Sequence, residues 1–353
     1  MSVLEQTIRA IAPLDERAMA AARARQSRLT KPPGSLGRLE RISVQVAGIQ
    51  RTSRPNVSQK AVFVMAADHG VVAQGVTAYP QGVTAQMVAN FAAGGAAINV
   101  LARHIGARVV IVDMGVAADL PPCPGLVCMK VAYGTCDLSC GPAMSADQAR
   151  CALEHGIEVF GSELSRGLQL AATGDMGIGN TTASAAIIAA ITGRSPSDVA
   201  GRGTGIDDHR LRRKIEVLER ALSVSRPDAS DGLDVLAKVG GFEIGGLAGV
   251  IIAAAAAHVP VVIDGVISGA AALIATTLAP QAKDYLIAGH LSTEPGHWAA
   301  LDHMAIEPLL DLDMRLGEGT GAALALGIVE ASVKLLNEMA TFDEAGVSGA
   351  LED

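Results

Sequence analysis

Short apolar runs recur along the chain, and longer stretches rich in alanine and leucine separate them. A continuous apolar run between turn residues is typical of a strand that is buried on both faces, as in a parallel sheet. We therefore expect strands at residues 61–67, 107–114, 168–172, 259–264 and 282–289. Because these strands alternate with helical patterns, the chain is predicted to belong to the α/β class.

The segments between the strands carry helix signals. Small residues predominate over 84–104, which predicts one long helix with Gln86 in its first turn, near the strand ends. Ser145 and Gln148 form a capping box, which predicts a helix that begins there. Asp208 is expected to cap another helix over 209–223.

A glycine-rich segment, GDMGIGNTTA at residues 174–183, joins a predicted strand to a predicted helix. Backbone N–H groups at a helix start have no partner inside the helix, so they attract anions, and phosphates above all. The candidate ligand contacts are glycines that permit a close backbone approach and polar side chains, namely Asp175, Gly177, Gly179, Asn180 and Thr181. The alternative is an ordinary strand-to-helix turn with a capped helix.

A second glycine-rich turn, GRGTG at residues 201–205, lies just before a helix that carries several cations. Its candidate contacts are Gly203, Thr204 and Gly205, with Lys214 behind them. Two such turns and a lysine together favour a phosphate pocket. For most of the cations, a solvated helix face is the alternative interpretation.

Several predicted strands end in aspartate or histidine close to a glycine, as at Asp68, Asp264 and His290. The carboxyl ends of the strands carry the ligand site in open α/β sheets, so these residues are site candidates. Asp68 and His69 are either site residues or parts of a strand-end turn. No metal is expected, because the histidines lack ligand spacing on any one element.

Glu318 lies between Gly317 and Gly319 at the start of the last long helix. The helix dipole would lower the pKa of its carboxyl group, whereas burial in an apolar neighbourhood would raise it. A buried Glu318 is therefore a candidate general base. A surface glutamate at a helix N-terminus is the alternative.

Composition excludes several classes of protein. Of the 353 residues, 50% are hydrophobic and 18% are charged, which is typical of a globular chain. The net charge of −8 and the aromatic content of 3% argue against nucleic-acid binding. Residues 1–28 are mixed and polar, without the apolar core of a signal peptide, and the apolar segment 247–263 contains His258 and Pro260. We therefore expect a cytoplasmic protein without a membrane span.

The cysteines do not follow a usual zinc or iron–sulfur spacing. Four of them lie in an irregular connection over 117–143, namely Cys123, Cys128, Cys136 and Cys140. Without a sign of export, disulfides are not expected either, and the role of these thiols stays open.

Seven segments together resemble the nicotinate-nucleotide–dimethylbenzimidazole phosphoribosyltransferases, enzymes of cobalamin nucleotide-loop assembly. The resemblance runs nearly end to end, and its segments occur in the family's order. They are KPPGSLGRLE (31–40), DHG (68–70), VTAQM (83–87), GDMGIGNTT (174–182), GRGTG (201–205), HLS (290–292) and GEGTG (317–321).

The resemblance implies a Rossmann-like parallel sheet flanked by helices over residues 55–305. It also implies a small helical domain from residues 1–54 and 306–353, and a homodimer. The implied reaction transfers phosphoribose from nicotinate mononucleotide to 5,6-dimethylbenzimidazole, giving α-ribazole 5′-phosphate and nicotinate without a cofactor. The physiological acceptor stays open among benzimidazoles and purines.

The resemblance also assigns roles to single residues. Glu318 falls on the family's catalytic base, and the two glycine-rich turns and Lys214 fall on its phosphate contacts. Ser292 falls near the nicotinate carboxylate site, and Gln86 and Leu316 fall near the benzimidazole pocket. Asp175 stands where the family usually has glutamate, so it keeps the charge with one methylene less, and its direct role stays open.

Two other functions remain as alternatives at this point. A nucleotide-binding or sensing protein without turnover would keep the glycine-rich turns but would not need Glu318 or Asp175. An NAD-dependent dehydrogenase is disfavoured, because the chain lacks the GxGxxG pattern at its strand-to-helix turns.

Overall fold

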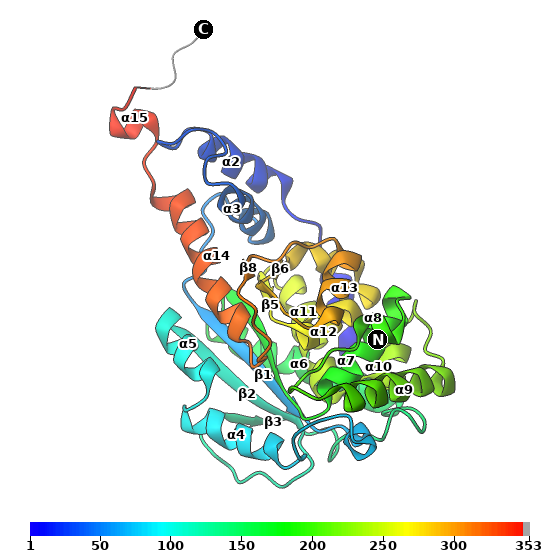
Figure 1. The fold of residues 1–353 in the computed structure, drawn as a ribbon. Helices are drawn as coiled ribbons and strands as arrows, with labels where there is room; N and C mark the ends of the chain where they lie inside the picture. The colour runs from blue at the N-terminus through cyan, green and yellow to red at the C-terminus, as the bar shows by residue number, and fades with distance from the viewer. Residues whose placement is uncertain (349–353) are drawn as a thin grey trace.

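A six-stranded parallel sheet forms the centre of the computed structural model, which describes residues 1–348 (Figure 1). The strand order is β3-β2-β1-β4-β5-β6. The strands are β1 (Lys60–Ala67), β2 (Ala107–Gly115), β3 (Leu126–Cys128), β4 (Leu170–Met176), β5 (Val261–Ile263) and β6 (Leu286–Ala288). This is the strand order of a Rossmann fold, with the chain reversing direction across the sheet between β1 and β4. The expected fold class is thereby confirmed.

Helices and two further short strands surround this sheet. The helices that precede β4 are α1 (Val3–Ala10), α2 (Glu16–Gln26), α3 (Arg38–Ile49), α4 (Val83–Ala93), α5 (Ala97–Ile105) and α6 (Ala146–Ser165). Those that follow it are α7 (Asn180–Thr192), α8 (Pro196–Val199), α9 (Asp208–Ser225), α10 (Gly232–Val239), α11 (Phe242–Ala256), α12 (Val266–Leu278), α13 (Pro295–Met304), α14 (Thr320–Glu338) and α15 (Phe342–Ala345). The 3₁₀ helices are η1 (Gly70–Gln74) and η2 (Pro280–Tyr285), and β7 (His290–Leu291) pairs with β8 (Leu310–Asp311).

The central strand β1 is buried along its whole length, as its continuous apolar sequence predicts. Its alternate side chains enter two separate cores. Phe63 and Met65 pack into the core formed with α6, α7, α11 and α12, whereas Val62 and Val64 pack into the core formed with α3, α5 and α14. Both faces of the sheet are therefore covered by helices. The carboxyl ends of the strands remain available for a ligand.

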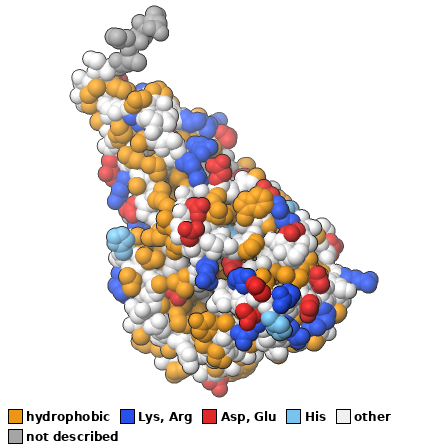
Figure 2. All heavy atoms as spheres, viewed as in Figure 1, with side chains coloured by type: hydrophobic (Ala, Val, Ile, Leu, Met, Phe, Trp, Pro, Cys, Tyr) orange, Lys and Arg blue, Asp and Glu red, His pale blue; other side chains and the backbone are white. Residues whose placement is uncertain are grey.

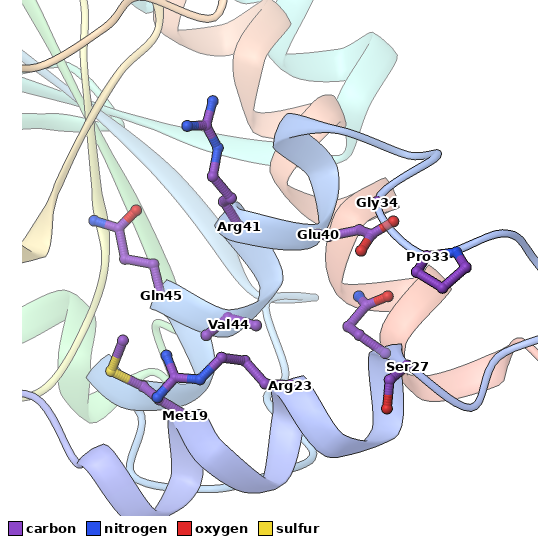
Figure 3. Close-up of a pocket in the computed structure, with 10 residues that line it drawn as sticks. Met19, Arg23, Ser27, Pro33, Gly34, Glu40, Arg41, Val44 and Gln45 are labelled. Carbon is purple, nitrogen blue, oxygen red and sulfur yellow. The ribbon is translucent and has the colours of Figure 1, made fainter.

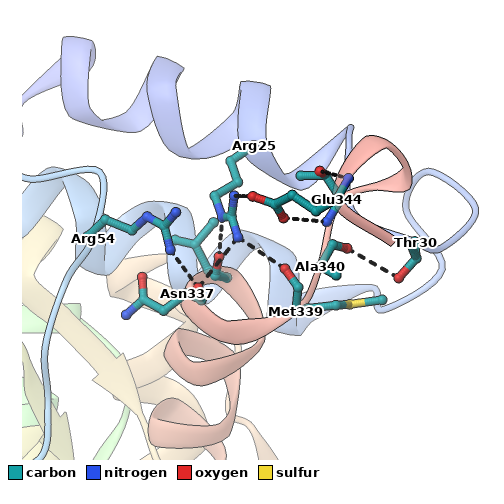
Figure 4. A network of polar contacts seen from close by, with 9 residues as sticks. Arg25, Thr30, Arg54, Asn337, Met339, Ala340 and Glu344 are labelled. Carbon is teal, nitrogen blue, oxygen red and sulfur yellow. Dashed lines mark hydrogen bonds and ion pairs between the residues drawn. The ribbon is translucent and has the colours of Figure 1, made fainter. Parts of the chain in front are cut away.

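The N- and C-terminal segments come together beyond one end of the sheet, where α2, α3, α15 and the second half of α14 form a helical cluster (Figure 1). Arg25 joins the two segments: its guanidinium donates to the carbonyl oxygens of Leu336 and Met339 (Figure 4). By contrast, α1 packs against α6 and α11. The division at 54/55 and 305/306 into two domains remains a prediction, and residues 349–353 lie outside the described residues.

Some predicted boundaries are wrong. The helix expected over 84–104 is two helices, because Gly94 adopts a left-handed φ of +78° and ends α4. The strand expected over 282–289 is reduced to β6, since Pro280 opens a 3₁₀ helix before it. The cap of α9 is Asp207, whose carboxylate accepts the N–H of Arg210, and not Asp208.

Two strand boundaries also differ from prediction. Strand β4 continues to Met176, because its ladder with β1 pairs Met65 with Asp175. The connection over 117–143, expected to be irregular, contributes the short edge strand β3.

Two apolar segments are long enough and apolar enough to cross a membrane, judged by length and composition alone. The first, Val83–Ile105, is interrupted between α4 and α5. The second is α14, which packs against α3, α5 and the sheet. In this fold both segments serve as amphipathic or core helices.

We predict that Gly156 is essential for the packing of α6 against α11. A Cβ atom at this position would lie 2.0 Å from the carbonyl oxygen of Gly246, so Gly156→Ala should force the helices apart. The expected loss is about 2–3 kcal/mol in the free energy of unfolding, measured by urea denaturation. Gly161 of the same helix is the matched control, because its Cβ would meet nothing within 4 Å. Gly161→Ala should raise stability by about 0.5–1 kcal/mol, and equal effects of both changes would contradict the packing argument.

Candidate active site

A cavity of about 620 Å³ lies at the carboxyl ends of the strands. It is close to the pair β1 and β4, between which the order of the strands reverses. Ligands bind at this position in open α/β sheets. The residues predicted from the sequence that line the cavity are Asp175, Gly177, Asn180, Thr181, Gly203, Thr204, His290, Ser292, Leu316 and Glu318. Residues from separate stretches of the chain therefore meet at one place.

The other predicted site residues do not line this cavity. Lys214 and Asp264 are fully buried behind its wall, and Gly179 is covered by Val72 and His69. Gly205 lies on the exposed side of its turn, with a left-handed φ of +97°. Gln86 is exposed on α4.

The face that α4 turns toward the cavity is apolar. Val83 and Met87, rather than Gln86, line the cavity from this helix. Tyr79 and Leu316 add further apolar surface. The exposed position of Gln86 follows from helical periodicity, since neighbouring residues of a helix point in different directions.

Asp68 and His69 support the central loop from below and do not line the cavity. The carboxylate of Asp68 accepts the hydroxyl of Thr84 at 2.7 Å, and the same hydroxyl oxygen accepts the N–H of Ile178 in the loop. His69 Nε2 lies 2.6 Å from the carboxylate of Glu243, and both side chains are fully buried. Of the two interpretations of Asp68 and His69, the strand-end turn agrees with this geometry.

The central loop itself needs its glycines. A Cβ at Gly177 would lie 2.4 Å from the carbonyl oxygen of Ala67, and Gly179 has a φ of +97° at the N-cap of α7. The loop therefore lies directly on the end of β1, and it accepts the N–H groups of Asn180 and Thr182 at its carbonyl oxygens of Gly177 and Gly179.

Lys214 connects the two glycine-rich turns. Its Nζ donates to the hydroxyl of Thr181 at 2.9 Å and to the carbonyl oxygen of Gly201 at 3.1 Å. Burial lowers the pKa of Lys214 to about 8, while the negative charge of Glu294 opposes this shift. The arginines of α9, in contrast, are exposed, and Figure 2 shows charges of both signs mixed over this region. The solvated-face interpretation therefore holds for the arginines and not for Lys214.

Two charged residues of the site were missed in the sequence. The carboxylate of Glu294 accepts the N–H of Gly203 at 2.8 Å, and the guanidinium of Arg315 donates to the carbonyl oxygen of the same residue at 2.9 Å. Both line the cavity. They hold the second glycine-rich turn beside the cavity. The sequence signal that could have identified them is their position next to the segments 290–292 and 317–321.

Glu318 reaches the cavity from an unusual backbone conformation. It has a φ of +61° between Gly317 and Gly319, which are also left-handed, and its carbonyl group lies against Gly174. The side chain is 6% exposed, and its Oε2 accepts the N–H of Ile98 at 3.2 Å. Burial raises the pKa of Glu318, and the Ile98 hydrogen bond opposes part of this rise. The surface-glutamate alternative does not agree with this burial.

Asp264 lies beneath Glu318 and holds the start of α14. Its carboxylate accepts the N–H of Gly319 at 3.2 Å and that of Ala322 at 2.9 Å. Burial raises the pKa of Asp264, while His290, whose Nδ1 lies 3.6 Å from the carboxylate, lowers it. Asp264 therefore anchors the loop that carries Glu318.

Asp175 is the third carboxyl group of the site. Its Oδ2 accepts the side-chain amide of Asn180 at 2.9 Å, and its Oδ1 has no hydrogen-bond partner among residues 1–348. Burial raises the pKa of Asp175 well above its ordinary value, and the charges of Asp264 and Glu243 add to this rise. Burial beside other carboxyl groups therefore favours the neutral form of Asp175.

The histidines near the site do not form a metal centre. His297 Nδ1 accepts the N–H of Ser292 at 3.0 Å, and burial lowers the pKa of His297 to about 3. Within residues 1–348, no three His, Cys, Asp or Glu side chains are grouped so that they could hold a metal ion. All five cysteines are unpaired thiols, and Cys128, Cys136 and Cys140 are exposed.

A second hollow of about 420 Å³ lies in the helical cluster, between α2 and α3 (Figure 3). Arg23 lines it from α2, and Glu40 and Arg41 line it from α3. The Nζ of Lys31 lies 2.7 Å from the carboxylate of Glu40. This ion pair joins the two ends of the 31–40 segment, so Lys31 stabilises that turn.

Comparison with known proteins identifies the family. A family model described as phosphoribosyltransferase matches residues 11–347. A nicotinate-nucleotide–dimethylbenzimidazole phosphoribosyltransferase of Chloroflexus aggregans is 64% identical over 99% of both chains, and one of Roseiflexus sp. (strain RS-1) is 62% identical over the whole of both. The chain belongs to the nicotinate-nucleotide–dimethylbenzimidazole phosphoribosyltransferase family.

The solved structures of this family agree with the fold described above. The crystal structure of CobT from Thermus thermophilus superposes with a TM-score of 0.92 at 48% sequence identity. It covers 95% of this chain and 100% of its own. The resemblance of the seven sequence segments to this family is thereby confirmed.

We predict that anion binding at the two turns depends on the charge of Lys214. Sulfate is a suitable probe, because its own charge stays constant over the pH range. Its affinity, measured by calorimetry, should fall about fivefold as the pH rises from about 8 to about 9, since Lys214 loses its proton there. Lys214→Met should bind sulfate weakly and without this pH dependence. The same pH dependence in the variant would rule out Lys214 as its source.

Proposed function

We propose that this chain transfers phosphoribose from nicotinate mononucleotide to 5,6-dimethylbenzimidazole, in the assembly of the nucleotide loop of cobalamin. The products are α-ribazole 5′-phosphate and nicotinate. The observation that carries the proposal is the buried carboxylate of Glu318, which lies between an apolar wall and two glycine-rich turns. The apolar wall suits the aromatic acceptor base, and the glycine-rich turns suit the phosphate group of the nucleotide.

The phosphate end consists of the turns at residues 177–179 and 203–205. Thr181 and Thr204 supply hydroxyl donors, and Lys214 and Arg315 supply positive charge. The nicotinate carboxylate is assigned to Ser292, whose hydroxyl lies at the cavity wall. Binding at both ends places the ribose C1′ between them, and such positioning supplies much of the rate.

The acceptor is assigned to the apolar surface of Val83, Met87 and Leu316, near Glu318. An aromatic ring without charge fits this surface, and its N–H then points to the carboxylate. Because Gln86 lies outside the cavity, we assign the acceptor contacts of α4 to Val83 and Met87 instead.

The chemistry balances with the groups at hand. The imine nitrogen of the benzimidazole attacks C1′, the bond from C1′ to the pyridinium nitrogen breaks, and that nitrogen keeps the electron pair. Nicotinate leaves without a proton, because its ring was already cationic. Glu318 takes the N–H proton of the benzimidazole, and attack from the opposite face inverts C1′ from β to α.

Asp175 has a different role from Glu318 in this proposal. Its environment keeps it protonated, so it serves as a neutral hydrogen-bond donor that faces the substrate. Nicotinate mononucleotide carries a carboxylate at one end and a phosphate at the other. A further ionised carboxylate in the site would repel both groups. The shorter side chain, relative to the glutamate usual in the family, preserves this neutral donor.

We further propose that the enzyme works as a homodimer in the cytoplasm and needs no cofactor. The five unpaired cysteines are consistent with a reducing compartment. A protein that only senses the nucleotide would have no use for a buried base beside an apolar wall. For this reason we favour turnover over sensing, and the strand-to-helix turns give no support to a dehydrogenase.

Glu318→Gln should lower turnover by about 10²- to 10⁴-fold, the usual contribution of a general base. Binding of nicotinate mononucleotide, measured by calorimetry, should change little. In the unchanged enzyme, kcat/KM should fall as the pH falls through the raised pKa of Glu318, because only the ionised form accepts the proton. A variant with full turnover would refute the role of Glu318.

Asp175→Asn should retain most of the turnover, within about tenfold, because the amide reproduces a neutral donor of the same shape. Asp175→Ala should lose more, since it removes the donor and leaves Asn180 without its partner. Steady-state rates for the two variants provide the comparison. If Asn were as damaging as Ala, Asp175 would have to act in its ionised form.

A further inference from the structure

The corner between α4 and α5 lies against Glu318, although it is distant from it in sequence. Helix α4 ends at Ala93, the chain turns through Gly94 and Gly95, and α5 begins at Ala97. The first N–H groups of α5 have no partner within their own helix. One of them, the N–H of Ile98, donates to Oε2 of Glu318 at 3.2 Å.

The side chain of Asn99 bonds to both sides of this corner. The carbonyl oxygen of the Asn99 side chain accepts the N–H of Ala96 at 3.1 Å, and its amide donates to the carbonyl oxygen of Phe91 at 3.1 Å. Asn99 is 8% exposed, so neither bond is readily replaced by water. Asn99 thus ties the end of α4 to the N-cap of α5, while the guanidinium of Arg103, in the last turn of α5, donates to the carbonyl oxygen of Gly94 at 2.9 Å.

The tie determines the direction of the Ile98 amide. Ala96 and Asn99 lie on either side of Ile98, whose own side chain is fully buried in the core with α14. Without the side chain of Asn99, the N–H of Ala96 would lose its partner, and the carbonyl oxygen of Phe91 would keep only the N–H of Gly94. The start of α5 would then be held less firmly, and the Ile98 amide would lose its alignment with the carboxylate.

We propose that Asn99 is a positioning residue for Glu318: it fixes the α4–α5 corner so that the Ile98 amide holds the carboxylate toward the acceptor. This inference rests on the proposed function, in which Glu318 is the general base. Asn99 itself does not line the cavity. It acts through the backbone of α5, and its effect should appear in the ionisation of Glu318.

Other charged groups also face Glu318 and must stay unchanged in the test. Asp175 faces it from β4 and Asp264 from the end of β5, with His290 of β7 next to Asp264. Arg315 lies in the same cavity wall. Helix α4 has no titratable side chain, and those of α5, at positions 103 and 104, lie in its last turn. Substitution of Asn99 therefore alters the amide contact and none of these groups.

The test measures kcat/KM against pH for the unchanged enzyme and for Asn99→Leu, which keeps the volume and removes both hydrogen bonds. Loss of one hydrogen bond to a carboxylate should move the acid limb of the profile upward by about one pH unit. The variant should then be about tenfold slower on that limb and should recover at high pH. Asn99→Ala, which avoids any overpacking, should show the same shift, so the test survives if the leucine variant does not fold.

The matched control is Asn337→Leu. Asn337 is another partly buried asparagine with a side-chain hydrogen bond to a backbone carbonyl, that of Pro55, at the far end of α14. This change should lower stability without moving the acid limb. A general loss of packing in the Asn99 variants would lower the rate equally at all pH values and would overturn the proposal.

A second readout does not depend on turnover. The carboxyl carbon of Glu318, labelled with ¹³C and identified by its absence in Glu318→Gln, reports its ionisation directly. An upward shift of this titration by about one pH unit in Asn99→Leu supports the positioning role, even if Glu318 proves not to be the base. An unchanged titration overturns the positioning role, whereas full turnover in Glu318→Gln would refute the proposed function alone.

Discussion

The site depends on one buried carboxylate, that of Asp264. It lies at the end of β5, between β4 and the edge strand β6, and accepts the first backbone N–H groups of α14. A buried carboxylate without such partners would be costly, and the N–H groups of the helix start would be left unpaired. The two needs are met by the same hydrogen bonds. As a result, the left-handed loop that carries Glu318 is fixed to the strand that ends beneath it.

This arrangement brings several acidic groups close to a substrate that is itself anionic. The structure resolves the conflict in two ways. Burial raises the pKa of Asp175 and so favours its neutral form, and Lys214 and Arg315 place positive charge beside the two glycine-rich turns, which we assign to the phosphate. The raised pKa values of Asp175 and Glu318 thus have one physical origin, which is burial next to Asp264, but they lead to different roles for the two groups.

Much of the fold and part of the site could be predicted from the sequence. The continuous apolar runs of β1 and β2 identify buried strands, and the glycine-rich segment 174–183 identifies the loop that follows β4. What could not be predicted depends on contacts between distant segments. Glu294 and Arg315 act on the backbone of Gly203, which is 91 and 112 residues away. The α4–α5 corner was missed because Gly94 and Gly95 lie in a run of small residues that also suits a helix. Gln86 was predicted to reach the ligand because it lies in the first turn of a helix near the strand ends. In the structure, Val83 and Met87 of that helix line the cavity instead.

The central claim is that this cavity joins a phosphoribosyl group to a benzimidazole with inversion at C1′. The most direct measurement mixes the protein with nicotinate mononucleotide and 5,6-dimethylbenzimidazole, without added metal, and separates the products. The account predicts equal amounts of nicotinate and α-ribazole 5′-phosphate. Binding of the nucleotide without release of nicotinate, across several azole and purine acceptors, would contradict it and would favour a sensing protein.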